Sequence, residues 1–288
     1  MMTGMDDMLA VTSIPTGRPV RHDPSPFVPT LDGAERDELV RAHLDSQAEA
    51  WDGPVVRLDR LEPFEVSVVG FFDLLATNIA LFTDGARMRT YAGRERINLL
   101  AERVRREAFG DAGAPATVEA LLGNRRLANV VAVSVLAVDP GSRAVLARRG
   151  RGAAISSGLW SATAGGSVEP GDLDAVDPFA AAARREAAEE LGADLGELRP
   201  LGLVFPAAKP QPIACYAAEI ESADELASNA RPGSDHTALT VVALAEVGPV
   251  EDFLARHGAT AATAWSMWQE AARRCSGGAL EAACGDGR

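Results

Sequence analysis

Residues 184–196 read RREAAEELGADLG and place three glutamates, Glu186, Glu189 and Glu190, close together in an alanine-rich stretch. On a helix, residues three and four apart lie on one face, so the three carboxylates share a face. Like charges at this spacing repel, and the dipole near a helix C-terminus disfavours anions. This arrangement is locally unfavourable, which a bound cation would explain. The competing interpretation is an ordinary helix face exposed to solvent.

A hard divalent cation suits such a cluster. Mg²⁺ and Mn²⁺ prefer carboxylate oxygens, with phosphates and waters completing their coordination. The stretch at residues 178–191 is strongly helix-prone and Gly192 follows it as a stop signal, so we expect a rigid helix there. The sequence therefore predicts a Mg²⁺ (or Mn²⁺) site on this helix. The alternative, a solvated helix in which Arg185 pairs with Glu189, stays open on these residues alone.

The composition excludes several other classes of protein. The chain has 288 residues, 47% of them apolar, and a net charge of −13, which argues against binding a nucleic-acid polymer. Its three cysteines, Cys215, Cys275 and Cys284, form no disulfide or zinc pattern. The most apolar run, at 66–82, is too short and too polar for a membrane span, and the N-terminus is acidic where a signal peptide would be basic. We therefore expect a reduced, cytoplasmic protein without a membrane segment.

Periodicity and turn residues predict the organisation of the chain. The domain boundaries expected are a flexible N-terminal arm at 1–26, an α+β region at 27–125, a second domain at 126–275 and a frayed tail at 276–288. In the second domain, strands at 129–139 and 143–149 form a hairpin around the turn PGS. Further strands are expected at 198–206, 212–220 and 236–244, a loop at 222–235, and helices at 250–258 and 261–275. This order indicates an α+β fold or a mixed-sheet sandwich, and not a regular βαβ alternation.

The helix and the segment before it, GLWSATAGGSVEPGD at 158–172, resemble the signature of the Nudix hydrolases, G-x5-E-x7-R-E-U-x-E-E-x-G-U, where U is a bulky aliphatic residue. The second half matches at Arg185, Glu186, Glu189, Glu190 and Gly192, although Ala187 and Ala193 are smaller than usual. In the first half, Gly166 takes the place of the first glycine and Asp172 that of the first glutamate, and residues 173–177 are then an insertion. This is the frame, that is, the alignment to the signature, that we prefer. A second frame, Gly171 and Asp177, keeps every spacing.

The resemblance covers residues 127–260 and implies a fold: a Nudix-type α/β/α sandwich with a mixed β-sheet, plus the smaller N-terminal α+β region. That N-terminal region, with FFDLLATN, resembles the segment before the Nudix domain in some actinobacterial and UDP-sugar-cleaving members.

The resemblance also implies an activity and a site. Nudix enzymes hydrolyse a nucleoside diphosphate linked to another moiety, so a nucleotide sugar is the first substrate expected. Glu186, Glu189 and Glu190 would be catalytic and bind the metal, and Arg185 would hold them. Arg149, Gly165 and Gly166 would bind substrate, with Arg148 and Arg151 as neighbouring cations. Asp172 or Glu169 would offer a further metal ligand, and Trp160 would stack on a base unless it packs in the core. The histidines receive no role.

Other readings stay open. One is a non-catalytic ligand-binding or regulatory protein on the same fold, and another is a hydrolase of a non-nucleotide diphosphate metabolite. An isopentenyl diphosphate isomerase is disfavoured, because that relative needs a cysteine where this chain has SATAGGS after Trp160. The partner expected is a small-molecule diphosphate, without nucleic acid or membrane. A homodimer is an open expectation, since many family members are dimers.

Overall fold

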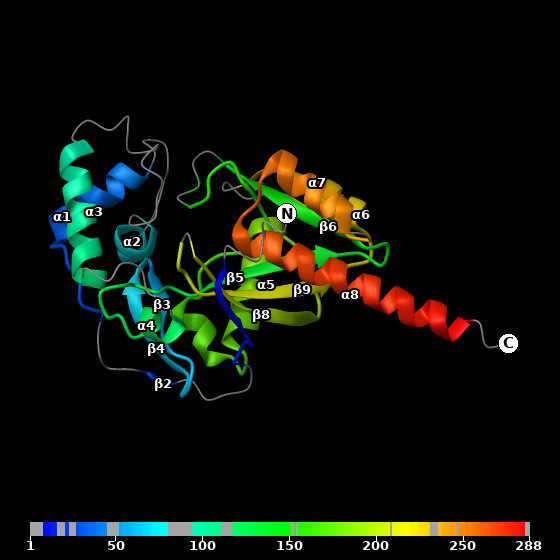
Figure 1. Cartoon of the computed structure of the whole chain (residues 1–288), viewed down its shortest axis with the longest axis horizontal. Coiled ribbons are helices and arrows are strands. Elements are labelled where there is room, and N and C mark those ends of the chain that lie inside the picture. Colours follow the sequence, from blue (N-terminus) through cyan, green and yellow to red (C-terminus); the bar gives the residue numbers. More distant parts are fainter. Residues whose placement is uncertain are drawn as a thin grey trace.

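The computed structural model describes residues 8–15, 21–22, 27–44, 52–79, 94–110, 117–150, 153, 155–207, 209–230, 236–245 and 247–285. Two sheets with their helices lie next to each other, the N-terminal one drawn in blue to teal and the larger one mainly in green to yellow, with one dark blue strand at its edge (Figure 1). Helix α8 (Ala261–Gly285) crosses the larger sheet and projects beyond it (Figure 1).

The larger sheet has seven strands in the order β1-β8-β9-β5-β6-β10, with β7 paired to β6. Their bounds are β1 Met8–Thr12, β5 Ala132–Val138, β6 Arg143–Arg149, β7 Trp160–Ser161, β8 Leu198–Pro206, β9 Ile213–Glu219 and β10 His236–Ala243. Strands β5 and β9 run parallel, and the other pairs are antiparallel. The sheet is therefore mixed.

Helices cover both faces of this sheet. Successive residues of a strand point to opposite faces, and both faces of β5 carry apolar side chains that a helix buries. Val133 and Val135 of β5 belong to the core that contains the buried side of α5 (Pro178–Leu191). Leu136 and Val138 belong to a second core with α7 (Val247–His257) and α8. The expected α/β/α sandwich with a mixed sheet is confirmed.

The N-terminal region contains a three-stranded sheet in the order β2-β4-β3. Its elements are β2 Arg21–His22, α1 Gly33–His43, β3 Pro54–Arg60, β4 Glu65–Gly70, α2 Phe71–Leu74, the π-helix η1 Leu75–Ile79, α3 Arg94–Phe109 and α4 Val118–Leu122. Helix α3 buries Ile97, Leu100 and Val104, the stripe that helical spacing predicts. The turn between β3 and β4 contains the peptide bond Glu62-Pro63, which is cis.

The two regions share main-chain bonds and one core. The Val56 amide of β3 donates to the Val168 carbonyl at 2.8 Å, and the Val131 amide donates to the Val56 carbonyl at 2.9 Å. Phe64 meets Phe179 of α5 edge-on, with ring centroids 5.5 Å apart. The buried Arg57 donates to the carbonyls of Leu122, Asn124 and Leu127, which lead into β5. The N-terminal region thus packs directly against the larger domain.

Three sequence predictions are wrong in part. Residues 8–12 of the expected flexible arm form β1, which pairs with β8 at the sheet edge. The expected loop at 222–235 begins with α6 (Ala223–Asn229), where the Ser222 side chain accepts from the Glu225 amide. The tail expected to fray after residue 275 is helical as far as Gly285, where α8 ends. Within the described ranges, no helix combines the length and apolar character needed to cross a bilayer.

A buried ion cluster fastens α8 to the sheet. The Glu270 side chain is 1% exposed and accepts from Arg199 of β8 and, at 3.1 Å, from Arg273. Arg274 lies 3.6 Å away. Burial by itself would raise the pKa of Glu270, but the hydrogen bonds from Arg199 and Arg273 outweigh it and hold that pKa below its usual value.

Replacing Glu270 by glutamine should therefore destabilise the fold by roughly 2 kcal/mol at pH 7, the scale of a charge-assisted buried hydrogen bond. Because the pKa of Glu270 is lower in the folded than in the unfolded protein, its carboxylate stabilises the fold fully at pH values above the unfolded pKa of about 4.3. This stabilisation is lost as the pH falls through the folded pKa. Urea unfolding at pH 7 and near pH 3 should show the gap between the two proteins shrinking in acid. An equal difference in the free energy of unfolding at both pH values would contradict this account.

Candidate active site

Helix α5 has clear local reasons to begin and end where it does. The Asp177 side chain caps the N-terminus by accepting from the Ala180 amide at 3.0 Å, and Pro178 occupies the first turn. Gly192 ends it in the left-handed conformation, with φ 66°. Its buried side consists largely of alanines, so the helix lies close to the sheet and presents its glutamates on the other side.

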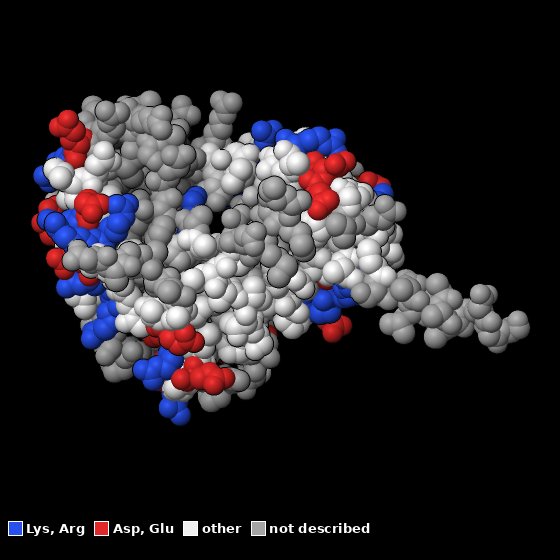
Figure 2. Space-filling view, in the orientation of Figure 1, with Lys and Arg blue, Asp and Glu red and all other residues white. Residues whose placement is uncertain are grey.

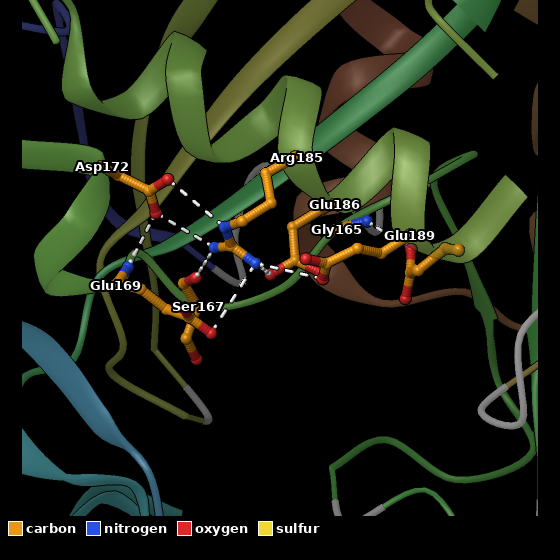
Figure 3. Close-up of polar contacts among 8 residues, drawn as sticks. Gly165, Ser167, Glu169, Asp172, Arg185, Glu186 and Glu189 are labelled. Carbon is orange, nitrogen blue, oxygen red and sulfur yellow. Dashed lines mark hydrogen bonds and ion pairs between the residues drawn. The ribbon is translucent and has the colours of Figure 1, made fainter. Parts of the chain in front are cut away.

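Arg185 is the centre of the polar contacts around this helix (Figure 3). It binds Asp172 through two bonds, Nη2 to Oδ2 at 3.0 Å and Nε to Oδ1 at 3.3 Å. Its Nη1 donates to Glu186 at 2.9 Å and to Glu189 at 3.3 Å, and Nη2 also donates to the Ser167 carbonyl at 2.8 Å. One guanidinium therefore orients two of the glutamates and ties them to the loop before the helix.

These contacts separate the two frames of the signature. Asp172 lies at Arg185, whereas Asp177 caps α5 and lies 3.5 Å from the Tyr216 hydroxyl. The frame with Gly166 and Asp172 is therefore the one that the structure forms, and the insertion at 173–177 begins within a short 3-10 turn, η5 (Pro170–Asp174). The Asp172 carboxylate also accepts from the Glu169 amide at 2.8 Å. With these partners Asp172 positions Arg185 instead of facing the pocket.

Gly165 and Gly166 allow the backbone to approach two of the glutamates. The Gly165 amide donates to Glu190 at 2.8 Å. A Cβ on Gly166 would lie 2.2 Å from the Glu186 carboxylate, and a Cβ on Gly165 would lie 2.5 Å from the Val133 carbonyl oxygen. Only glycine fits at either position without movement of a neighbour.

The three glutamates differ in their surroundings. The side chains of Glu186 and Glu190 are 13% and 14% exposed, and that of Glu189 is 59% exposed. Burial raises the pKa of Glu186, although the neighbouring Arg185 opposes the shift. Burial alone would lower the pKa of Arg185, but the contacts with Asp172 and Glu186 outweigh this effect. The pKa is therefore raised above its usual value, and the guanidinium stays charged. Positive charge at Arg185 thus partly offsets the repulsion between the carboxylates.

A pocket of about 520 Å³ opens at this end of the sheet. Glu186, Glu190, Gly165 and Gly166 line it, and Arg149 reaches it from β6. The other lining residues that matter here are Phe71, Lys209 and Gln211. The surface in Figure 2 is hollowed between the N-terminal helices and the larger domain, and its charged side chains gather mainly away from this hollow. The pocket therefore combines carboxylates, cations and an apolar wall.

The donor atoms at this pocket suit a hard cation. Glu186 and Glu190 offer carboxylate oxygens at its wall, and Glu189 lies on the same helix face, accessible to solvent. In the described part of the chain, however, no three acidic, histidine or cysteine side chains already converge on one point. The chemistry of the residues fits Mg²⁺ or Mn²⁺, and binding would draw these carboxylates away from Arg185 and the Gly165 amide.

Several other expected site residues lie elsewhere. Trp160 packs edge-on against Phe253 with centroids 5.8 Å apart, so it belongs to the core. Arg148 is exposed and, as the strand neighbour of Arg149, points to the opposite face. Arg151 lies outside the described residues.

Sequence reasoning missed four residues near the site. His236 is buried at the start of β10, and its Nδ1 lies 3.7 Å from Glu190. Phe71, Lys209 and Gln211 line the pocket from segments outside the signature. No local spacing marks these residues, although the proline-rich run KPQP around Lys209 and Gln211 indicates a stiff loop.

Replacing Arg185 by lysine should reduce kcat about 10- to 100-fold, the usual effect of losing a group that orients metal-binding side chains. Lysine keeps the charge but cannot bind Asp172 through two parallel bonds while reaching Glu186 and Glu189. The adjacent and exposed Arg184, changed to lysine, is the matched control and should keep its rate. Equal activity of the two variants would show that charge alone suffices.

Comparison with known proteins relates part of this chain to a known family. No curated protein matches the sequence. Among solved structures, the MutT Nudix hydrolase of Burkholderia pseudomallei is 26% identical over 49% of this chain and 96% of that one, with a TM-score of 0.36. The NUDIX domain of Shewanella oneidensis NrtR, complexed with ADP ribose, is 14% identical over 50% and 87%, with a TM-score of 0.38.

The family model described as the NUDIX domain matches residues 128–263. This range contains both halves of the signature, the helix with its three glutamates and the strands that frame the pocket. The chain therefore carries a NUDIX domain at residues 128–263.

Proposed function

We propose that this Nudix domain hydrolyses a nucleoside diphosphate linked to another moiety, with a nucleotide sugar as the first substrate to test. We propose further that the reaction requires Mg²⁺ or Mn²⁺ held by Glu186, Glu189 and Glu190. The observation that carries the proposal is the pocket, which Glu186 and Glu190 line together with Arg149 and Lys209. A volume of about 520 Å³ is in the range of small-molecule sites.

Each part of the pocket has a task in this reaction. Arg149 and Lys209 are placed to neutralise phosphate oxygens. A divalent cation at the glutamates would stabilise the charge that develops on the phosphates and lower the pKa of a bound water. Water adds to one phosphorus, the bridging P–O bond breaks, and two monophosphates result. Arg185, tied to Asp172, keeps Glu186 and Glu189 oriented in the absence of substrate.

The setting of the enzyme is part of the proposal. A net charge of −13 supports a small diphosphate substrate over a nucleic-acid polymer. We propose a cytoplasmic location and a catalytic unit over residues 126–275, packed on an α+β region at 27–125. Size-exclusion chromatography with light scattering would decide between a monomer and a homodimer.

A substrate panel tests the proposed activity. The full chain would be incubated with nucleotide sugars, ADP-ribose, dinucleotides, nucleoside triphosphates and prenyl diphosphates, with Mg²⁺ or Mn²⁺ and with excess EDTA, and products separated by HPLC. We expect metal-dependent formation of nucleoside monophosphate from one class. Cleavage of prenyl diphosphates alone would favour the non-nucleotide substrate. No turnover, together with a ligand-induced thermal shift, would favour the non-catalytic binder.

A further inference from the structure

The pocket receives one wall from outside the Nudix domain. Phe71, the first residue of α2, lines it and is the one aromatic side chain among the described lining residues. Every other described lining residue comes from position 132 or later in the sequence. The pocket is therefore completed by the N-terminal region, through a single aromatic ring.

The first turn of α2 is held firmly in place. The Phe71 amide donates to the Gly53 carbonyl at 2.9 Å, and the Phe72 amide donates to the Asp52 side chain at 2.8 Å. Arg36 of α1 bridges Asp52 at 3.1 Å and Asp73 at 3.2 Å. Because these bonds act on both sides of Phe71, its main chain is held beside the pocket before any ligand binds.

The far end of the same helix holds the loop on the other side of the pocket. The Asn78 side chain of η1 is fully buried, and its amide donates to the Pro210 carbonyl at 2.7 Å. It also donates to the Asn129 side chain at 2.9 Å and accepts from the Asn129 amide at 3.0 Å. Pro210 lies between Lys209 and Gln211, which both line the pocket. Residues 71–79 thus supply one wall and anchor a second.

The chemistry of these walls selects a planar heterocycle. A flat aromatic face attracts any nucleobase by stacking. Gln211 is buried, with 7% of the residue exposed, and its neutral side-chain amide carries both hydrogen-bond donors and an acceptor, as the edge of a base requires. Ile155, Leu159 and Ile213 add apolar surface. By contrast, a bare sugar would find few polar partners along this wall.

We propose that Phe71 is a specificity-determining residue that stacks on the base of the substrate, and that residues 71–79 are part of the substrate site. This inference rests on the proposed hydrolysis of a nucleoside diphosphate compound, and it goes further by assigning the base to a wall that the Nudix domain does not contain. The expected consequence is that Phe71 controls KM for substrates with a base and leaves kcat little changed.

The test compares two neighbouring phenylalanines of the full chain. Phe71→Leu should raise KM for the best substrate of the panel about tenfold, the scale of losing one base-stacking contact, with kcat within about twofold. Phe71→Tyr, which keeps the ring, should restore KM. Phe72→Leu is the matched control, because Phe72 packs against the same core as Phe71 but is not among the lining residues. Its KM should match the wild type.

A binding experiment makes the result independent of turnover. Calorimetry with UMP, AMP, CMP and GMP, and with ribose 5-phosphate as the baseless control, would measure affinity in the presence of EDTA. Phe71→Leu should weaken the tightest nucleotide about tenfold and leave ribose 5-phosphate unchanged. An unchanged KM and nucleotide affinity in Phe71→Leu, in an enzyme that hydrolyses nucleotide substrates, would overturn the role of Phe71 alone. Absence of any hydrolysis would instead count against the proposed function.

Discussion

Replacing Glu189 by glutamine is expected to lower kcat for diphosphate hydrolysis by about a hundred- to a thousandfold, while the thermal midpoint moves by no more than about 2 °C. A bound cation contributes several kcal/mol of transition-state stabilisation, and glutamine removes a charged ligand without changing the shape of the side chain. Because Glu189 is 59% exposed and beside Glu186, loss of its charge should cost the fold little. Initial rates against Mg²⁺ concentration, with differential scanning calorimetry, measure both effects.

The exposed Glu197, changed to glutamine, is the control for this result, since it makes the same charge change in a loop beyond α5. It should behave as the wild type. The double variant Glu189→Gln with Glu190→Gln should have no measurable metal-dependent activity. If that double variant still hydrolyses the substrate, the carboxylates of α5 do not form the metal site.

Changing Gly166 to alanine should reduce kcat about a hundredfold with a small loss of stability. A Cβ at this position would lie 2.2 Å from the Glu186 carboxylate, so the carboxylate must move by more than about 1 Å, a displacement of the size that lowers rates by this factor. The obstructed atoms are the end of a flexible side chain, which explains why folding should survive. Steady-state kinetics and the thermal midpoint of the same preparation test both halves of the prediction.

The neighbouring Gly165 gives the contrasting result. Its Cβ would meet the main-chain carbonyl oxygen of Val133 at 2.5 Å, and a central strand cannot yield as a side chain does. Overpacking in Gly165→Ala should therefore reduce the free energy of unfolding by about 1–3 kcal/mol and lower the thermal midpoint clearly. Equal melting temperatures for the two alanine variants would show that the loop before α5 shifts as a unit, and would contradict the assignment of separate constraints.

Local sequence patterns determined the elements that carry the site. The alanine-rich run with Asp177 before it and Gly192 after it predicts α5, because capping and helix propensity act within a few residues. The apolar run before PGS predicts the β5–β6 hairpin for the same reason. The spacing of Glu186, Glu189 and Glu190 then places three carboxylates on one face. Where local signals were weak, as in α6 and the end of α8, the sequence prediction failed.

Only the tertiary structure decided which groups meet. The sequence allowed two frames of the signature and favoured the one with Asp172, and the structure supports that frame by placing Asp172, and not Asp177, at Arg185. The approach of His236 to Glu190 and of Phe71 to the pocket joins segments far apart in the chain. Such contacts depend on how the sheet and the N-terminal region pack, a sum of many long-range interactions that no local spacing records. The sequence by itself thus determined the helix and its charges, while packing determined their partners.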